Sequence, residues 1–290
     1  MGGQFKTIGI IGKPDAPNLA APIAQLVSFL RRRSMKIVLD TRTAAHLDPA
    51  TCAMAELDVI GKQTDLVIVV GGDGTMLGVA RKLAPQGVPI IGVNLGRLGF
   101  LTDIPFHDME PALAAILDGE YSAEDRMLLQ TTIQRDGRSV FDTLALNDVV
   151  VSRGSMGSMI ELDVYIDAQF SYNLRSDGLI VSTPTGSTAY SLSSGGPILH
   201  PHLDAISMVP ISPHTLSNRP IVIAAKAVIE IALIRGPNAC ANFDVQSKFD
   251  LLPLDKVVVR AAPHPIKLLH PKNYDYYAML REKLHWSAKL

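Results

Sequence analysis

Residues 66–75 read LVIVVGGDGT, and this stretch decides the fold class that we predict for the 290-residue chain. Residues 66–70 form a continuous aliphatic run, which is typical of a strand buried on both faces of a parallel sheet. A glycine-rich turn follows, and residues 75–83 have the pattern of a helix. Such a turn lies at the carboxyl end of a sheet strand, where open α/β folds bind their ligands.

The sequence on both sides of this stretch repeats the pattern of strand and helix. Strands are predicted at residues 7–12, 36–39 and 89–93, and apolar residues recur at helical spacing over residues 23–30. Another helix is predicted over residues 108–117, with Asp108 as its N-cap. Alternating strands and helices indicate a parallel sheet with crossover helices, and therefore an α/β domain over residues 1–125.

A second domain is predicted over residues 126–270, because strands there follow one another without intervening helices. Asp136-Gly137 lies between two β-rich runs and is typical of a hairpin turn. Residues 162–166 alternate apolar with polar side chains, as a strand with one buried face does. We therefore expect this domain to be mainly β. Residues 271–290 are predicted to form a helical tail that packs back on the first domain.

The turn after the buried strand carries the clearest chemical signal. Gly71, Gly72 and Gly74 lack Cβ atoms, so a phosphate chain can approach the backbone N–H groups, and the start of a helix adds partial positive charge. An acidic residue in such a turn is unusual, and we interpret Asp73 as a proton acceptor or a contributor to metal binding. The alternative is that Asp73 only caps the helix and the glycines only form the turn.

Two common nucleotide motifs are incomplete in this chain. Residues 9–12 supply only a fragment of the Gly-x-Gly-x-x-Gly fingerprint, so no Rossmann dehydrogenase is indicated. Residues 87–92 have the glycine spacing of a P-loop, but Val93-Asn94 follows where Lys and Ser or Thr are required.

Two further segments are candidates for ligand binding. Residues 175–197 are rich in Ser, Thr and Gly, so they can offer many hydrogen-bonding groups to sugars and amides, and Tyr190 offers an aromatic face to a ring. A polar surface turn is the alternative interpretation. Residues 92–100 are glycine-rich after a predicted strand, and they form either part of a nucleotide cleft or a structural turn.

Together these segments resemble the signature of the NAD kinases, of the bacterial ATP-NAD kinase type. The Gly-Gly-Asp-Gly turn is shared more widely with diacylglycerol and sphingosine kinases and with phosphofructokinases, whereas the 175–197 segment is much more specific. Asn147-Asp148 is similar to a third family motif, usually Asn-Glu, and Asp244 with Gln246 is similar to a late Asp-x-Gln motif. The resemblance covers nearly the whole chain.

The resemblance implies a Rossmann-like N-terminal domain of the phosphofructokinase and diacylglycerol-kinase type, a β-sandwich C-terminal domain, and a nucleotide site between them. It implies ATP-dependent phosphorylation of the adenosine ribose 2′-hydroxyl of NAD to give NADP, with Asp73 as the general base. Mg²⁺ or another divalent cation is expected on the ATP phosphates, and no protein metal ligand is assigned. The positions implied to bind the nucleotides are Gly71, Gly72, Gly74, Asn147, Asp148, Ser158, Arg175, Asp177, Thr188, Ala189, Tyr190, Ser191, Leu192, Ser193 and Gln246.

Two other functions are alternatives to this interpretation. A lipid kinase of the diacylglycerol or sphingosine type would need a pocket for an acyl chain, and the polar 175–197 segment argues against one. A catalytically idle sensor that binds NAD(P)(H) is the second alternative, and the presence of Asp73 argues against it. Asp148, Ser194 and Val245 depart from residues that are more common in the family, but none of them replaces the proposed base.

Composition restricts the partners and the compartment. With 27 basic and 28 acidic residues the net charge is −1, so nucleic acid and anionic membranes are not expected partners. The longest apolar stretch, residues 221–234, contains charges and is too short to cross a bilayer. Two cysteines, Cys52 and Cys240, fit a reducing compartment. We therefore expect a soluble cytoplasmic enzyme with small-molecule substrates, assembled as a homodimer or homotetramer as the family resemblance implies.

Overall fold

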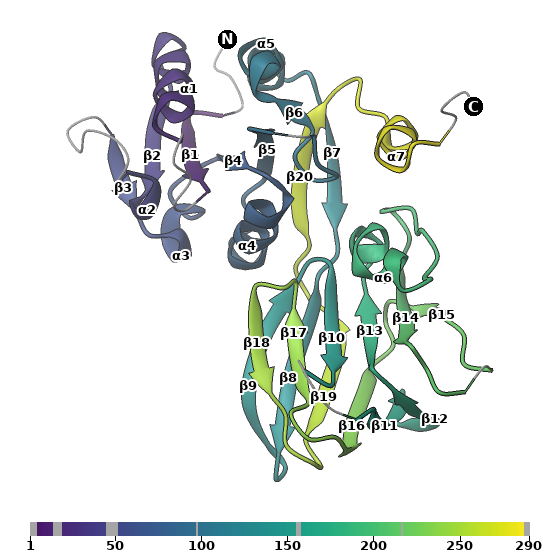
Figure 1. Cartoon of the computed structure of the whole chain (residues 1–290). Helices are drawn as coiled ribbons and strands as arrows, with labels where there is room; N and C mark the ends of the chain where they lie inside the picture. Colours follow the sequence, from purple (N-terminus) through teal and green to yellow (C-terminus); the bar gives the residue numbers. More distant parts are fainter. Residues whose placement is uncertain are drawn as a thin grey trace. The chain divides into compact units, whose positions relative to one another are not determined.

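The structure is a computed structural model that describes residues 5–13, 19–44, 52–96, 98–154, 158–215 and 217–286. It divides into two compact units (Figure 1). Unit 1 comprises residues 1–125 and 266–290, and unit 2 comprises residues 126–265. The second domain was predicted to end at residue 270, but Ile266–Pro271 forms a strand in the sheet of unit 1.

Unit 1 is an α/β unit built on one sheet. In the described part of the chain the strand order is β3-β2-β1-β4-β5-β20-β7, and β6 pairs with β5. The pairs from β3 through β4 to β5 and β6 are parallel. These strands are β1 (Thr7–Gly12), β2 (Lys36–Asp40), β3 (Ala53–Ala55), β4 (Leu66–Gly71), β5 (Ile90–Asn94), β6 (Ile104–Pro105), β7 (Tyr121–Arg126) and β20 (Ile266–Pro271).

Helices and short helical turns connect the strands of unit 1. They are α1 (Ala20–Arg32), α2 (Thr41–Ala44), α3 (Leu57–Ile60), α4 (Asp73–Leu83), η1 (Ala84–Gln86), η2 (Phe106–Asp108), α5 (Met109–Leu117) and α7 (Tyr276–Leu284). Helices α1 and α5 share one hydrophobic core with alternate residues of the sheet, such as Ile68 and Val70 of β4. Val67 and Val69 are also fully buried, and they point to the opposite face because side chains alternate along a strand. β4 is therefore covered on both faces, as its aliphatic run predicts.

Two details of the helices differ from the sequence predictions. Helix α4 begins at Asp73, two residues before the predicted start, because Gly72 is its extended N-cap residue and the N–H groups of Thr75 and Met76 bond to the carbonyl of Gly72. Asp108 precedes α5 but its side chain makes no capping hydrogen bond. The predicted cap at that helix is therefore wrong.

Unit 2 is a sandwich of two antiparallel sheets, with strand orders β15-β14-β13-β10-β17-β18 and β12-β11-β16-β19-β8-β9 in the described residues. Val149, Val181 and Phe243 of the first sheet and Leu162 and Ile231 of the second belong to one core, so the two sheets pack face to face. The strands are β8 (Leu129–Arg135), β9 (Arg138–Ala145), β10 (Asp148–Ser152), β11 (Ile160–Ile166), β12 (Gln169–Ser176), β13 (Gly178–Ser182), β14 (Ala205–Ile211), β15 (Ile221–Ala224), β16 (Ile229–Arg235), β17 (Cys240–Phe243), β18 (Ser247–Asp250) and β19 (Lys256–Ala261).

Loops of unit 2 contain the short helical segments η3 (Thr185–Thr188) and α6 (Tyr190–Ser193). The predicted hairpin turn is present between β8 and β9, where Asp136 and Gly137 both have positive φ and Arg135 pairs with Arg138. This is the backbone that the Asp-Gly pair favours. No helix among the described residues combines the length and apolar character needed to cross a membrane.

Candidate active site

The candidate site of unit 1 is the turn between β4 and α4. At Gly71 a Cβ atom would lie 2.6 Å from the hydroxyl oxygen of Thr75, whereas a Cβ at Gly72 would meet nothing within 4 Å. Gly71 therefore allows the strand to pass tightly into the helix, and Gly72 leaves open space beside the helix N-terminus. This is the geometry that backbone N–H groups need in order to approach an anion.

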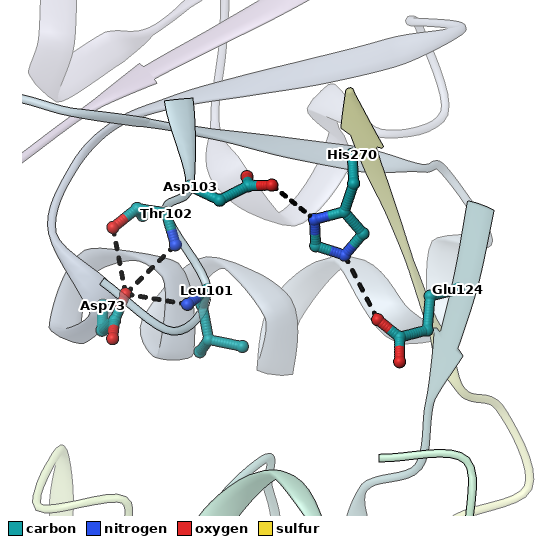
Figure 2. Close-up of polar contacts among 6 residues, drawn as sticks. All are labelled: Asp73, Leu101, Thr102, Asp103, Glu124 and His270. Carbon is teal, nitrogen blue, oxygen red and sulfur yellow. Dashed lines mark hydrogen bonds and ion pairs between the residues drawn. The ribbon is translucent and has the colours of Figure 1, made fainter. Parts of the chain in front are cut away.

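Asp73, the first residue of α4, is held by a second turn that follows β5. Its Oδ1 accepts hydrogen bonds from the backbone N–H groups of Leu101 and Thr102, both 3.1 Å, and from the Thr102 hydroxyl at 3.0 Å (Figure 2). Its Oδ2 accepts one from the N–H of Phe100 at 2.8 Å. A carboxylate has about four acceptor positions, so Oδ2 is the oxygen with room for a further proton.

The segment that holds Asp73 is stabilised by its own polar contacts. Asn94, at the end of β5, donates to the Thr102 hydroxyl at 2.7 Å and accepts from the N–H of Gly96 at 2.7 Å. Gly99 is packed so closely that a Cβ atom there would overlap the Asp73 carboxylate and lie 2.5 Å from the Thr102 hydroxyl. Within the 92–100 segment, Arg97 lies outside the described residues.

The sequence did not predict the hydrogen bonds from residues 100–102 to Asp73. Phe100, Leu101 and Thr102 bind Asp73 mainly through backbone N–H groups, which leave no signature in residue type. The available signal was the glycine-rich stretch after β5, since β5 neighbours β4 in the sheet and the carboxyl ends of parallel neighbours lie at the same edge.

The candidate site of unit 2 centres on the turn before β10. Buried Asp244 accepts hydrogen bonds from the backbone N–H groups of Leu146, Asn147 and Asp148, at 2.7, 2.8 and 3.0 Å. Gly186 of η3 lies against the same turn, because a Cβ atom there would overlap the carbonyl oxygen of Asn147. The structure thus brings Asn147 and Asp148 together with the middle of the Ser/Thr-rich segment, around Gly186.

Asp148 has unusual electrostatics in this arrangement. Its side chain is buried, and this burial together with the nearby charge of Asp244 raises the pKa of Asp148 to about 7. A carboxyl group that is close to half protonated at neutral pH can donate as well as accept a hydrogen bond.

We expect Asp148→Asn to flatten the dependence of stability on pH. The folded-state pKa of Asp148 lies above its unfolded value of 3.8, so its contribution to stability is fully present below about pH 4 and is lost as pH rises to about 7, by at most about 1.4 kcal/mol per pH unit. Thermal unfolding at pH 5 and pH 7 measures this loss. Asp250→Asn removes an exposed carboxylate and is the matched control; equal slopes in wild type and Asp148→Asn would contradict the expectation.

The Ser/Thr-rich segment divides into structural and accessible parts. The Thr183 hydroxyl bonds to the carbonyl of Leu146 at 2.6 Å, and the Ser187 hydroxyl bonds to the carbonyl of Pro184 at 2.6 Å. These two hydroxyls therefore hold the loop in place. Among the predicted contact residues Ser191 is buried, Thr188, Ala189 and Leu192 are half-buried, and Tyr190 and Ser193 are exposed.

The predicted contact residues of unit 2 lie in two groups. Asp148 pairs with Ser182 at one end of β10 and β13, and Ser152 pairs with Gly178 at the other. The turn at residues 147–148 and the loop that starts at residue 183 share the first end, whereas Arg175 and Asp177 precede Gly178 at the second. Asp177 forms an ion pair there with Arg153 at 3.1 Å. Ser158 is exposed before β11, and Gln246 is exposed after the turn that contains Asp244.

Val245 adopts a conformation that is costly for a branched side chain. It has φ +56° and is 88% exposed, so no packing offsets the strain of the left-handed region. We expect Val245→Gly to raise the free energy of unfolding by about 1 kcal/mol, which is the relief of strain less the entropy cost of glycine. Thermal denaturation measures it. Val222→Gly, at an exposed position within β15, is the control and should lower stability; a lower melting temperature for Val245→Gly would contradict this account.

Comparison with known proteins relates both units to one family. Residues 8–121 match the ATP-NAD kinase N-terminal domain, and residues 146–271 match the ATP-NAD kinase C-terminal domain. The chain is 52% identical over 288 residues to the NAD kinase of Nitrosospira multiformis, which covers 99% of this chain and 98% of that protein. It is 49% identical to the NAD kinase of Laribacter hongkongensis over the full length of both proteins.

Solved structures are similar as well. The crystal structure of yeast NADH kinase complexed with NADH superposes with a TM-score of 0.89 and 26% identity, covering 99% of this chain and 89% of that one. The NAD kinase from Archaeoglobus fulgidus in complex with ATP superposes with a TM-score of 0.75 and 24% identity, covering 96% and 98%. Because its sequence identity is only 24%, the Archaeoglobus fulgidus structure shows a shared fold and nothing further.

Proposed function

The chain belongs to the NAD kinase family, and we propose that it transfers the γ-phosphoryl group of ATP to the adenosine ribose 2′-hydroxyl of NAD, with Asp73 as the general base. The predicted family, the fold class and NAD kinase function are confirmed by the relatives at about 50% identity over the full chain. The alcohol acceptor and the roles of individual residues are the parts that we propose.

The observation that carries the proposal is the position and hydrogen bonding of Asp73. The carboxylate lies at the start of a helix beside the open space at Gly72, and its Oδ2 accepts a single hydrogen bond within the described residues. In the proposed reaction Oδ2 takes the hydroxyl proton, the ribose oxygen forms a bond to the γ-phosphorus, and the bond from that phosphorus to the ADP oxygen breaks. The products are NADP and ADP.

Positioning and charge stabilisation account for most of the catalysis in phosphoryl transfer. We propose that Gly71, Gly72 and Gly74 let the triphosphate approach the helix N-terminus, and that Asn147, Asp148, residues 188–193 and Gln246 bind the dinucleotide. Two observations support the dinucleotide contacts. Asp244 holds the 146–148 turn through backbone hydrogen bonds, and the ring of Tyr190 is exposed. Ser158, Arg175 and Asp177 remain proposed contacts, although they lie away from that turn.

The divalent cation is proposed to enter as part of the substrate, MgATP. Among the described residues no group of three or more His, Cys, Asp or Glu side chains is arranged to hold a metal ion. Phosphate oxygens and water are proposed to fill most of its coordination shell, as is usual for Mg²⁺.

We also propose a cytoplasmic location and a homodimer or homotetramer. Both cysteines are free thiols, which is compatible with a reducing compartment. Arg175 and Asp177 lie away from the 147–148 turn. This separation supports an oligomer in which Arg175 and Asp177 of a second copy complete the site at the 147–148 turn. Light scattering of the purified protein measures the assembly.

The proposed function is tested by incubating the purified protein with MgATP and NAD and separating the nucleotides by chromatography. We expect ADP and NADP to form in equal amounts, and phosphorus NMR to place the new phosphate on the 2′-oxygen. NAD binding without NADP formation would favour the idle sensor, and phosphorylation of diacylglycerol or sphingosine instead of NAD would favour the lipid kinase.

A further inference from the structure

A buried histidine lies next to the turn that holds Asp73. His270 is on β20, and its side chain is 2% exposed. Its Nδ1 lies 2.8 Å from Oδ2 of Asp103, and its Nε2 lies 3.3 Å from Oε2 of Glu124 on β7 (Figure 2). The Tyr274 ring stacks on the imidazole, with centroids 4.1 Å apart and an interplanar angle of 14°. The two carboxylates therefore hold the imidazole within its plane, and the Tyr274 ring packs against one of its faces.

Nδ1 makes a hydrogen bond to Asp103, whereas Nε2 lies only at ion-pair distance from Glu124. Asp103 depends strongly on its bond to His270. The Asp103 side chain is 4% exposed, and within the described residues its Oδ1 has no hydrogen-bond partner. A buried carboxylate with so few partners is costly, so the bond to His270 decides where the Asp103 side chain can lie.

Asp103 connects His270 to the proposed base. It directly follows Thr102, whose N–H and hydroxyl both bond to Asp73, and Leu101 bonds to the same Oδ1. Four consecutive residues, 100–103, thus bind Asp73 through the first three and His270 through the last. Figure 2 shows the contacts of Leu101, Thr102 and Asp103. A movement of Asp103 would shift the N–H groups that set the orientation of the Asp73 carboxylate.

We propose that His270 is a positioning residue for catalysis, which acts through Asp103 to fix the 100–102 turn and so aims the Asp73 carboxylate. This inference rests on the proposed role of Asp73. His270 reaches this place only because β20, although distant in sequence, lies next to β5 in the sheet. The C-terminal part of unit 1 therefore contributes to catalysis without contacting substrate.

Two isosteric substitutions separate the two contacts of the ring. In His270→Asn the amide nitrogen takes the place of Nδ1 and can still donate to Asp103. In His270→Gln the amide nitrogen takes the place of Nε2, so the bond to Asp103 is lost while a donor toward Glu124 is kept. We expect His270→Gln to lower kcat by about 10- to 100-fold, as small misplacements of reacting groups do, with KM for NAD and for ATP changed less than about 3-fold. His270→Asn should retain kcat within about 3-fold of wild type.

Asp103→Ala completes the test. If His270 acts through Asp103, the double variant Asp103→Ala/His270→Gln should lose no more activity than the more damaging single variant, because the two effects are not independent. Melting temperatures show whether each variant is folded. Equal losses of kcat in His270→Asn and His270→Gln, multiplicative losses in the double variant, or an unchanged kcat in His270→Gln would each overturn the inference. Absence of NADP formation by the wild type would instead overturn the proposed function.

Discussion

Asp73→Asn is expected to lower kcat for NADP formation by about 10²- to 10⁴-fold, the range that a positioned general base contributes. Asparagine is nearly isosteric with aspartate, and its carbonyl oxygen can still accept the hydrogen bonds of Leu101 and Thr102, while the single bond from the Phe100 N–H to Oδ2 is lost. Its amide nitrogen cannot accept the proton of the ribose hydroxyl. The dissociation constant for NAD, measured by isothermal titration calorimetry, should therefore stay within about 3-fold of the wild-type value.

A control separates the loss of the base from damage to the turn. Thr102→Val removes one donor to Oδ1, the bond of 3.0 Å from the hydroxyl, and also the acceptor of the Asn94 amide, but it leaves the carboxylate and the backbone N–H bonds in place. We expect this variant to lose much less activity than Asp73→Asn, about 10-fold at most. Similar kcat losses in the two variants would mean that Asp73 serves mainly to hold the turn.

Gly99→Ala is expected to lower kcat by about 10²-fold, because a new methyl group would occupy the space of the Asp73 carboxylate and a displacement of about 1 Å can have an effect of this size. The overlap involves the end of a side chain. The carboxylate can therefore rotate away, at the loss of hydrogen bonds to residues 100–102. Steady-state kinetics with NAD and MgATP measure the change.

Gly96→Ala is the matched control in the same loop. A Cβ atom at Gly96 would lie 3.8 Å from Oδ1 of Asn94, which is an ordinary contact, and the N–H bond to that oxygen is kept. This variant should retain activity within about 3-fold. If Gly99→Ala and Gly96→Ala have the same kcat, the orientation of Asp73 is not set by the close packing at Gly99.

Sequence patterns predicted the individual strands and turns of this protein better than they predicted which strands pair with one another. The aliphatic run of β4 and the glycines after it are local signals, and they predicted a buried strand and a turn where the structure has both. Asp136-Gly137 predicted a hairpin because positive φ at both residues is a local preference. Residues 266–271 have no local feature that distinguishes a strand of one unit from a strand of the other, so their place between β5 and β7 could not be predicted.

The same limit applies to the candidate site. Asp73 was identified because a carboxylate is unusual in a glycine turn, but its hydrogen bonds come mainly from backbone N–H groups that every residue type except proline possesses. Asp244 was noted only as part of a motif, whereas in the structure it holds the 146–148 backbone and contributes to the raised pKa of Asp148. His270 gave no signal, because its partners are Asp103 and Glu124, which are far from it in sequence.

The proposed mechanism requires the Asp73 carboxylate to accept the proton of the adenosine ribose 2′-hydroxyl. A crystal structure of the enzyme with NAD and a non-hydrolysable ATP analogue would show whether it is placed to do so. We predict that an oxygen of Asp73 lies within about 2.6–3.2 Å of the 2′-oxygen, with the 100–102 turn still bonded to Oδ1. A carboxylate that faces away from both the ribose and the phosphates in that complex would contradict the account.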